Sequence, residues 1–360
     1  ADTALTVSLI GGVAVGVFGF FATEPLLRLM GTTKEILPSA VPYMKAYFTG
    51  MPGCLLYNYL AAIQRSGGDT KHPLLFLAIS GVANVGLNIL MVAGFKLGAL
   101  GVGIATSASQ YIAAAAILIF MLREEGCCRV TGFALDGERL KKMVLIGLPA
   151  GLQGTLFSLS NVIIQSSINA YGTYVVAGNA AGSNLDGFLY IAMNSVYTAA
   201  LTFVGQNVGA GKYARIKKIS FLCVGLVTFI GVVLGVVLVV FGEKLLLIFA
   251  TGENKDAVVK AGMNRLLVMG TTYFLCGLMD VGCGIMRGMG KTILPMIVSL
   301  VGSCLFRIVW IATVCPLFPG NILALYISYP ISWFITAAGH NGCCIHNYRA
   351  LMRRGAVPAV

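Results

Sequence analysis

The sequence predicts an all-α integral membrane protein. Hydrophobic residues make up 58% of its 360 positions and charged residues only 11%, whereas about 25% of a typical soluble domain is charged. The mean hydropathy of +0.87 points the same way. Apolar runs of about 20 residues, the length that crosses a bilayer as a helix, recur along the chain. Because lipid offers backbone groups no hydrogen-bond partners, each run is expected to be helical.

We predict ten membrane-spanning helices in two groups. Four spans precede a polar stretch that contains "REEG" and "LDGERLKK", and six spans follow it. The other connections are short, so this stretch is expected to link two bundles. The ten spans are expected at 3–22, 43–64, 73–94, 98–122, 143–170, 175–204, 219–241, 261–286, 293–315 and 322–345. The predicted domains are an N-terminal lobe at 1–122, a cytoplasmic linker at 123–142, a C-terminal lobe at 143–348 and a cytoplasmic tail at 349–360.

The fifth and sixth spans each carry a row of polar side chains. Asn161 and Gln165 are four residues apart in the fifth span, and Asn179, Ser183 and Tyr190 recur at helical spacing in the sixth. Residues at such spacing share a helix face. Each row therefore predicts a face turned toward a cavity and its substrate. The alternative is that these groups hold neighbouring helices together in the membrane.

Two later spans are marked by small or special residues. The seventh span lacks a polar row, and we expect it to face lipid or to pack through Gly231 and Gly235. Pro295 opens the ninth span, where a missing backbone N–H costs little.

The net charge of +12 is attributed to membrane topology, and no nucleic-acid partner is expected. If alternate connections share one side of the membrane, that side and the C-terminal tail hold 16 of the 25 lysines and arginines. The side richer in positive charge is cytoplasmic. We expect a multi-pass protein in the lipid bilayer of the cytoplasmic membrane, with its C-terminus inside the cell.

The stretch "RGMGKTILP" at 287–295 looks like the end of a phosphate-binding loop but does not fit one. That motif needs a glycine five residues before Gly290, where the chain has Ile285. A membrane-embedded enzyme would need a nucleophile–base pair or clustered acids such as D-D-x-x-D, and the sequence shows neither. The cysteines lack the ligand spacing of a zinc site. We therefore expect no enzyme, no catalytic residue and no cofactor.

An internal repeat organises the chain. "RSGGDTKHP" at 65–73 and "RGMGKTILP" at 287–295 keep Arg and Pro at the same spacing, 222 residues apart. Upstream, "GVAVG" at 12–16 matches "GVVLG" at 231–235 at a slightly smaller offset. An even number of spans separates the copies, so both cross the membrane in the same direction. The lobes should be related by a pseudo-two-fold axis along the membrane normal, as in some transporters.

The repeat also leaves two spans of the C-terminal lobe without a partner. The fifth and sixth spans have no counterpart before the first one. We expect ten helices here of a twelve-helix, two-lobe plan, with the sequence upstream of Ala1 continuing it.

Four stretches resemble the multidrug and toxic compound extrusion (MATE) transporters, and most closely the bacterial branch. They are "GMPGCLLYNYLAAIQRSGGDTKHPL", "GLPAGLQGTLFSLSNVIIQSSINAYG", "QNVGAGKYARIKK" and "GIMRGMGKTILPMI". The resemblance covers nearly the whole chain, apart from the first two helices of the family.

That resemblance implies a secondary active antiporter that exports cationic or amphipathic drugs in exchange for Na⁺ or H⁺, by alternating access. It implies a small organic cation as substrate, and we expect a monomer. The alternative is a flippase for a lipid or a lipid-linked saccharide on a related two-lobe fold. A flippase should have a more basic cavity, whereas Arg307 is the only base we place inside a span.

Two acids within spans are the candidates for ion coupling. An acid at mid-span costs at least about 2.5 kcal/mol, so it usually faces a partner or a wet cavity. Asp186 has no evident basic partner in the sequence and is favoured as the ion-linked group, with Na⁺ as a possible ligand. Asp280 is expected to pair with Arg307 on the next helix, either as a structural or as a working pair.

The first lobe has no acid inside the four spans present. Asn58 occupies the repeat position of Asp280 and is assigned to the cavity with the two polar rows. Some members of the MATE family carry an acid on the seventh helix, where this chain has Phe157. That departure gives further weight to Asp186 and Asp280.

Overall fold

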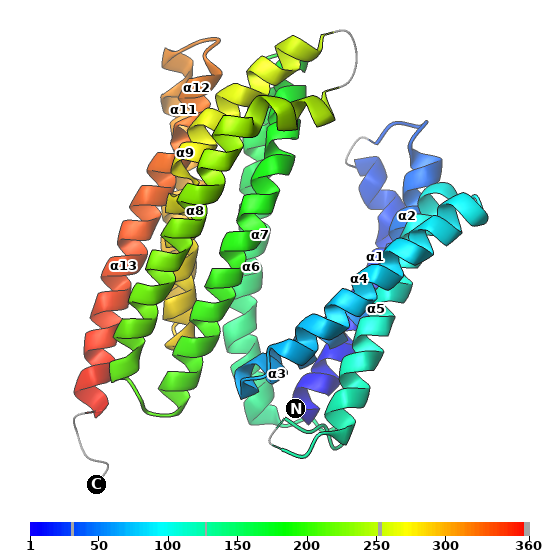
Figure 1. Cartoon of the computed structure of the whole chain (residues 1–360), viewed down its shortest axis with the longest axis vertical. Helices are drawn as coiled ribbons and strands as arrows, with labels where there is room; N and C mark the ends of the chain where they lie inside the picture. The colour runs from blue at the N-terminus through cyan, green and yellow to red at the C-terminus, as the bar shows by residue number, and fades with distance from the viewer. Residues whose placement is uncertain (30–31, 127, 251–253, 356–360) are drawn as a thin grey trace. The chain divides into compact units, whose positions relative to one another are not determined.

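The computed structural model describes residues 1–29, 32–126, 128–250 and 254–355. The described residues form helices and turns and contain no strand. The chain divides into two compact units, Ala1–Met143 and Val144–Val360, and each is considered by itself (Figure 1). Within the described residues, nine helices are long and apolar enough to span a membrane.

The first unit is built around α1, α3 and α5, and its buried centre includes Leu60, Ile117 and Met121. α4 packs on α5, and α2 packs on α1 and α5. The elements are α1 (Asp2–Leu29), α2 (Leu37–Thr49), α3 (Met51–Gly67), α4 (Lys71–Ile89), the π-helical segment η1 (Leu90–Gly94) and α5 (Gly98–Arg123).

The second predicted span, 43–64, is not one helix. It divides at Gly50 into α2 and α3, each too short to count among the nine spans. Pro52 opens α3 and cannot donate a backbone hydrogen bond to the preceding turn. Gly50 there approaches Ser107 of α5 so closely that an added Cβ would lie 2.6 Å from the Ser107 hydroxyl oxygen.

The second unit is organised around α9, which packs against α7, α8 and α13. In Figure 1, α9 runs behind α8 and α13. The elements are α6 (Gly137–Asn169), α7 (Thr173–Gly209), α8 (Ala214–Phe249), α9 (Lys255–Gly288), α10 (Ile293–Ser299), the π-helical η2 (Leu300–Leu305), α11 (Phe306–Thr313), the 3₁₀ turn η3 (Cys315–Leu317), α12 (Ile322–Tyr326) and α13 (Ser328–Gly355). α6 begins at Gly137, inside the stretch predicted as linker, and its residues up to Met143 are counted with the first unit.

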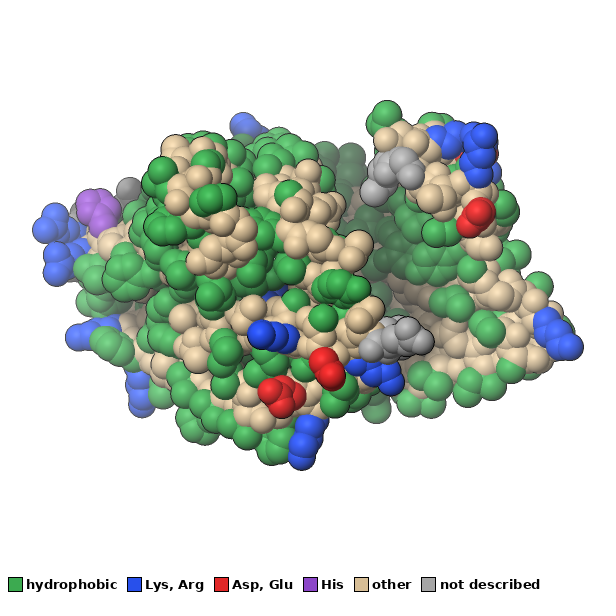
Figure 2. Space-filling view, turned by 90° about the horizontal axis from the view of Figure 1, so that it is seen from above, with side chains coloured by type: hydrophobic (Ala, Val, Ile, Leu, Met, Phe, Trp, Pro, Cys, Tyr) green, Lys and Arg blue, Asp and Glu red, His purple; other side chains and the backbone are tan. Residues whose placement is uncertain are grey.

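The outer faces of these helices are apolar, as a bilayer requires. Phe18, Phe21 and Val82 are all at least 70% exposed. Figure 2 is seen from above, along the longest axis, and there charged side chains lie among hydrophobic ones. A soluble monomer rarely exposes many large apolar side chains together, so the exposed apolar flanks of the helices fit contact with lipid.

The predicted repeat recurs in the turns. Gly68, after α3, has φ +100°, and Gly290, after α9, has φ +79°, a left-handed conformation that glycine adopts without strain. Gly68 donates its backbone N–H to the Arg65 carbonyl, and Gly290 donates to the Arg287 carbonyl, each three residues back. In both copies the next residue donates five residues back, the paired bonds of a Schellman helix end.

The repeat also recurs in helix packing. Gly12 of α1 lies so close to Pro52 that an added Cβ would be only 2.5 Å from the Pro52 Cα. Its counterpart Gly231 of α8 lies similarly close to Phe274 of α9, where an added Cβ would be 2.8 Å from the Phe274 Cα. Phe274 lies 222 positions after Pro52 and therefore occupies the same position in the second copy of the repeat. The expectation that α8 packs through Gly231 is thereby confirmed.

Candidate functional site

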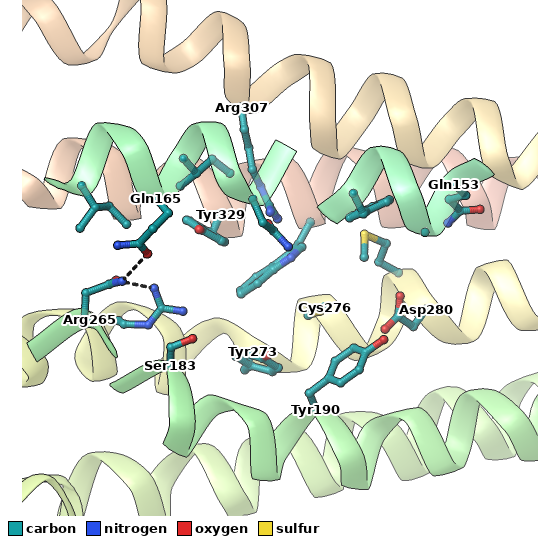
Figure 3. A pocket seen from close by; sticks show the side chains of 18 of the residues that line it. Gln153, Gln165, Ser183, Tyr190, Arg265, Tyr273, Cys276, Asp280, Arg307 and Tyr329 are labelled. Atoms are coloured by element: carbon teal, nitrogen blue, oxygen red, sulfur yellow. Dashed lines mark hydrogen bonds between the residues drawn. The ribbon is translucent and has the colours of Figure 1, made fainter. Parts of the chain in front are cut away.

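A polar cavity of about 640 Å³ lies inside the second unit (Figure 3). Its walls come from α6, α7, α9, α11 and α13. The two polar rows predicted from the sequence meet here, because Asn161, Gln165, Asn179, Ser183 and Tyr190 all line it. Their role toward a substrate stays a prediction.

A chain of hydrogen bonds crosses the cavity from α6 to α9. Asn179 donates from its amide nitrogen to the Gln165 Oε1 at 3.2 Å, and Gln165 in turn donates to Asn169. The Asn179 Oδ1 accepts from Arg265 Nη1 at 2.8 Å and from the Tyr326 hydroxyl. Both interpretations of the polar rows therefore apply, because some of their residues line the cavity and also hold neighbouring helices together.

Asp186 has a basic partner, contrary to expectation. Its Oδ2 accepts from Arg265 Nε at 2.9 Å and lies 2.8 Å from Arg265 Nη2. Both side chains are buried. The sequence places Arg265 close to the start of the predicted span 261–286, but α9 begins at Lys255 and carries this residue inside the unit. The ion pair ties α7 to α9, and the guanidinium opposes a Na⁺ ion at this carboxylate.

Asp280 stands without a partner in the cavity wall. Among the described residues its carboxylate makes no hydrogen bond or salt bridge, and the side chain is half-buried. Figure 3 shows the Tyr190 hydroxyl directed toward it. The neighbouring Met279 carbonyl is engaged by His340 Nδ1 at 2.8 Å, which fixes the backbone of α9 at this level against α13.

The expected pair between Asp280 and Arg307 does not form. Arg307 donates from Nε to the Ser332 hydroxyl at 2.8 Å, and its guanidinium lies 4.2 Å from the Tyr329 ring centroid. It makes no salt bridge within the described part of the chain. The π-helical η2 immediately precedes α11 and Arg307. A π segment adds a residue to the turn, which changes the direction in which the following side chains point, and sequence spacing does not reveal it.

Arg287 is a cavity residue that sequence reasoning missed. It lies in the last turn of α9, whereas the sequence predicts that it follows the span 261–286 and belongs to the connection before the next span. Its side chain points back into the unit, with Nη1 donating to the Tyr197 hydroxyl at 2.7 Å and Nη2 to the Gln153 Oε1 at 2.8 Å. The available signal was its spacing: Arg287 follows Asp280 by seven residues, two helical turns on the same face.

Asn58 lies in the first unit and is exposed on α3, where its amide donates to the Cys54 carbonyl. It is not part of the cavity in the second unit. Over the described residues, no three His, Cys, Asp or Glu side chains group together as a metal site would require. A Na⁺ ion at Asp186 or Asp280 would therefore take most of its ligands from carbonyl, amide and hydroxyl oxygens.

Long apolar helices, a lipid-type outer surface and a polar cavity inside the bundle define a multi-pass membrane transporter. The MatE family model matches residues 1–90 and 149–313, and the chain belongs to this family. The chain is 30% identical to the probable multidrug resistance protein YpnP of Bacillus subtilis over 307 residues, which cover 84% of this chain and 67% of that protein.

Two further comparisons agree. The chain is 25% identical over 344 residues to the probable multidrug resistance protein YoeA of Bacillus subtilis, covering 93% of this chain and 73% of that protein. A solved outward-facing multidrug resistance MATE family transporter of the MOP superfamily superposes with a TM-score of 0.90 at 17% identity. That match covers 96% of this chain and 78% of the solved one, and it establishes the shared fold.

Proposed function

We propose that the protein is a secondary active transporter that exports amphipathic organic molecules across the cytoplasmic membrane while Na⁺ or H⁺ enters. Membership of the MatE family and the multidrug resistance relatives support export of drug-like compounds. Ion coupling and alternating access go beyond that support and rest on the cavity of the second unit.

The unpaired carboxylate of Asp280 carries the proposal. A charged group inside a membrane-spanning bundle is costly and usually marks an ion pathway or a substrate site. Asp186 is already neutralised by Arg265, whereas Asp280 has no ion-pair partner among the described residues. Asp280 can take up and release a proton, or bind a cation, without breaking an existing salt bridge. We therefore assign the coupling role first to Asp280 and second to Asp186.

The experiment is ion-driven ethidium efflux from proteoliposomes under an imposed Na⁺ or proton gradient. Asp280→Asn keeps the size of the side chain and removes its charge, so we expect it to lower the ion-driven rate at least about tenfold, a loss of about 1.4 kcal/mol or more. Glu243→Gln is the matched control, because Glu243 is an exposed acid on α8. Comparing the two gradients identifies the coupling ion.

A wild-type ion-driven rate in Asp280→Asn would remove this residue from the mechanism. If Asp186→Asn alone then lost coupling while remaining folded, the original assignment to Asp186 would stand. Equal efflux with and without any gradient would contradict the antiport proposal as a whole.

The flippase alternative is stronger than the sequence suggested. It was disfavoured because Arg307 was the only base placed inside a span, yet Arg265, Arg287 and Arg307 all line the cavity. A lipid flippase should move a fluorescent phospholipid between leaflets of the same proteoliposomes. Lipid movement without ethidium efflux would favour it over drug export.

A further inference from the structure

The cavity of the second unit carries more positive than negative charge. Three arginines and Asp280 line it. Arg265 is neutralised by Asp186 through the salt bridge. Neither Arg287 nor Arg307 forms a salt bridge within the described residues, and Asp280 is the single acid left to balance them.

Arg307, which lines this cavity, has one hydrogen-bond donor without a partner in the described structure. Only 5% of the residue is exposed, and its Nε is committed to the Ser332 hydroxyl. Its Nη2 is buried and has no hydrogen-bond partner in the described structure. Leaving a charged donor unsatisfied is costly, so the position is suited to an acceptor that arrives from outside the chain.

The orientation of this guanidinium is fixed by its surroundings. One face lies 4.2 Å from the Tyr329 ring centroid, and the Trp333 centroid is 5.7 Å away. Trp333 packs edge-on against Tyr273 and Tyr329. All three aromatic residues line the cavity, and they offer flat apolar surface beside the free donor. A volume of about 640 Å³ is in the range of sites for drug-sized ligands.

We propose that this cavity binds an aromatic organic anion, with a carboxylate or phosphate oxygen on Arg307 Nη2 and the ring against the Trp333–Tyr273 wall. A guanidinium matches the geometry and charge of these groups better than any other side chain. The inference rests on the proposed transport function and names a substrate class for it. It departs from the organic cation implied by the family resemblance, because the two arginines without an acidic partner outnumber Asp280 and disfavour an organic cation beside Arg307.

The test measures equilibrium binding of carboxyfluorescein, an aromatic anion, to the purified protein by fluorescence polarisation in a neutral detergent. Arg307→Gln should weaken binding about tenfold or more, the usual loss for a hydrogen bond to a charged group. Arg307→Lys retains the charge and should lose less. Arg215→Gln removes an exposed arginine at the start of α8 and should bind as wild type does.

Asp280→Asn makes the test independent of misfolding. It removes the negative charge from the cavity wall, so it should tighten carboxyfluorescein binding by roughly two- to fivefold. Loss of the folded cavity would weaken binding at this site rather than tighten it. Arg307→Gln with wild-type affinity, or Asp280→Asn with no gain, overturns the proposal.

Two further arms separate the possible outcomes. Lipid nanodiscs of phosphatidylcholine with and without phosphatidylglycerol test whether a lipid headgroup is the natural occupant. Binding of carboxyfluorescein in both lipids supports a soluble anion, whereas an Arg307-dependent retention of phosphatidylglycerol that excludes the dye overturns it. Binding requires no ion gradient, so a protein that binds carboxyfluorescein but exports neither ethidium nor carboxyfluorescein under a gradient would contradict the transport function and leave this site standing.

Discussion

The four charged residues of α9 and α11 that line the cavity differ in what satisfies them. Arg265 is satisfied by Asp186 and Asn179. Arg287 is bound by two neutral groups, and Arg307 by one hydroxyl and one aromatic face. Asp280 has none of these. The number of hydrogen-bond and ion-pair partners therefore separates the charged residues that maintain the fold from those that are free to bind a ligand.

The Asp186–Arg265 pair yields a prediction about stability. Removing one partner leaves the other charge buried and uncompensated, which typically costs about 3–5 kcal/mol. We expect Arg265→Gln to lower the thermal unfolding midpoint in detergent strongly, and the double variant Arg265→Gln, Asp186→Asn to regain part of it. Asp280→Asn, which breaks no pair, should leave the midpoint near wild type.

A midpoint for Arg265→Gln equal to that of wild type would show that the pair adds nothing to stability. In that case Asp186 would rank equally with Asp280 as a candidate for ion coupling, since its charge would be free to exchange partners.

Sequence patterns located the polar rows but not the ion pairs. Asn179 and Gln165 face each other because helical spacing fixes the face of each residue. The partner of a buried charge depends instead on helix register and rotation. Arg265 comes within reach of Asp186 because α7 and α9 pack closely at Gly182, where an added Cβ would lie 3.0 Å from the Arg265 Cδ. A single sequence carries no direct signal for such a contact.

At the scale of elements, α8 and α9 are held together by glycine. A Cβ on Gly235 would lie 2.0 Å from the Gly270 carbonyl oxygen, so the two backbones touch directly. In the first unit, Gly16 of α1 lies over the Phe48 carbonyl, and an added Cβ would be 2.9 Å from the carbonyl oxygen. The repeat thus preserves a close helix crossing, of the kind that small residues permit in membranes. The sequence match between 12–16 and 231–235 predicted that these glycines are equivalent in the two copies of the repeat. It did not predict which helices they pack against.

This crossing gives a prediction with an internal control. Gly235→Ala forces α8 away from the α9 backbone, and overpacking of this kind costs about 1–3 kcal/mol. Gly225 lies on the same helix with no atom within 4 Å of an added Cβ. Gly225→Ala should therefore be neutral or slightly stabilising, because alanine is the better helix former. Thermal unfolding of both variants in one detergent makes the comparison, and equal midpoints would contradict the close crossing.

At the scale of the whole molecule, composition alone predicted the class of fold. An all-helical chain with long apolar spans follows from the hydropathy, and the MatE family match agrees with it. Details of helix continuity did not follow. The break at Gly50 and the π-helical segments η1 and η2 arise from packing and from local hydrogen bonding, which hydropathy averages away.

The orientation of the chain in the membrane is the last prediction. The connections near 65–71, 123–142, 212–218 and 287–291 share an excess of Lys and Arg with the C-terminal tail, which predicts that they lie in the cytoplasm. Arg287 weakens this argument slightly, because its side chain turns into the cavity, but Lys291 and the other connections retain the bias. We expect a C-terminal green fluorescent protein fusion to fluoresce in cells and a C-terminal alkaline phosphatase fusion to be inactive. The opposite pair of results would invert the topology, and the proposed direction of export would then have to be reversed with it.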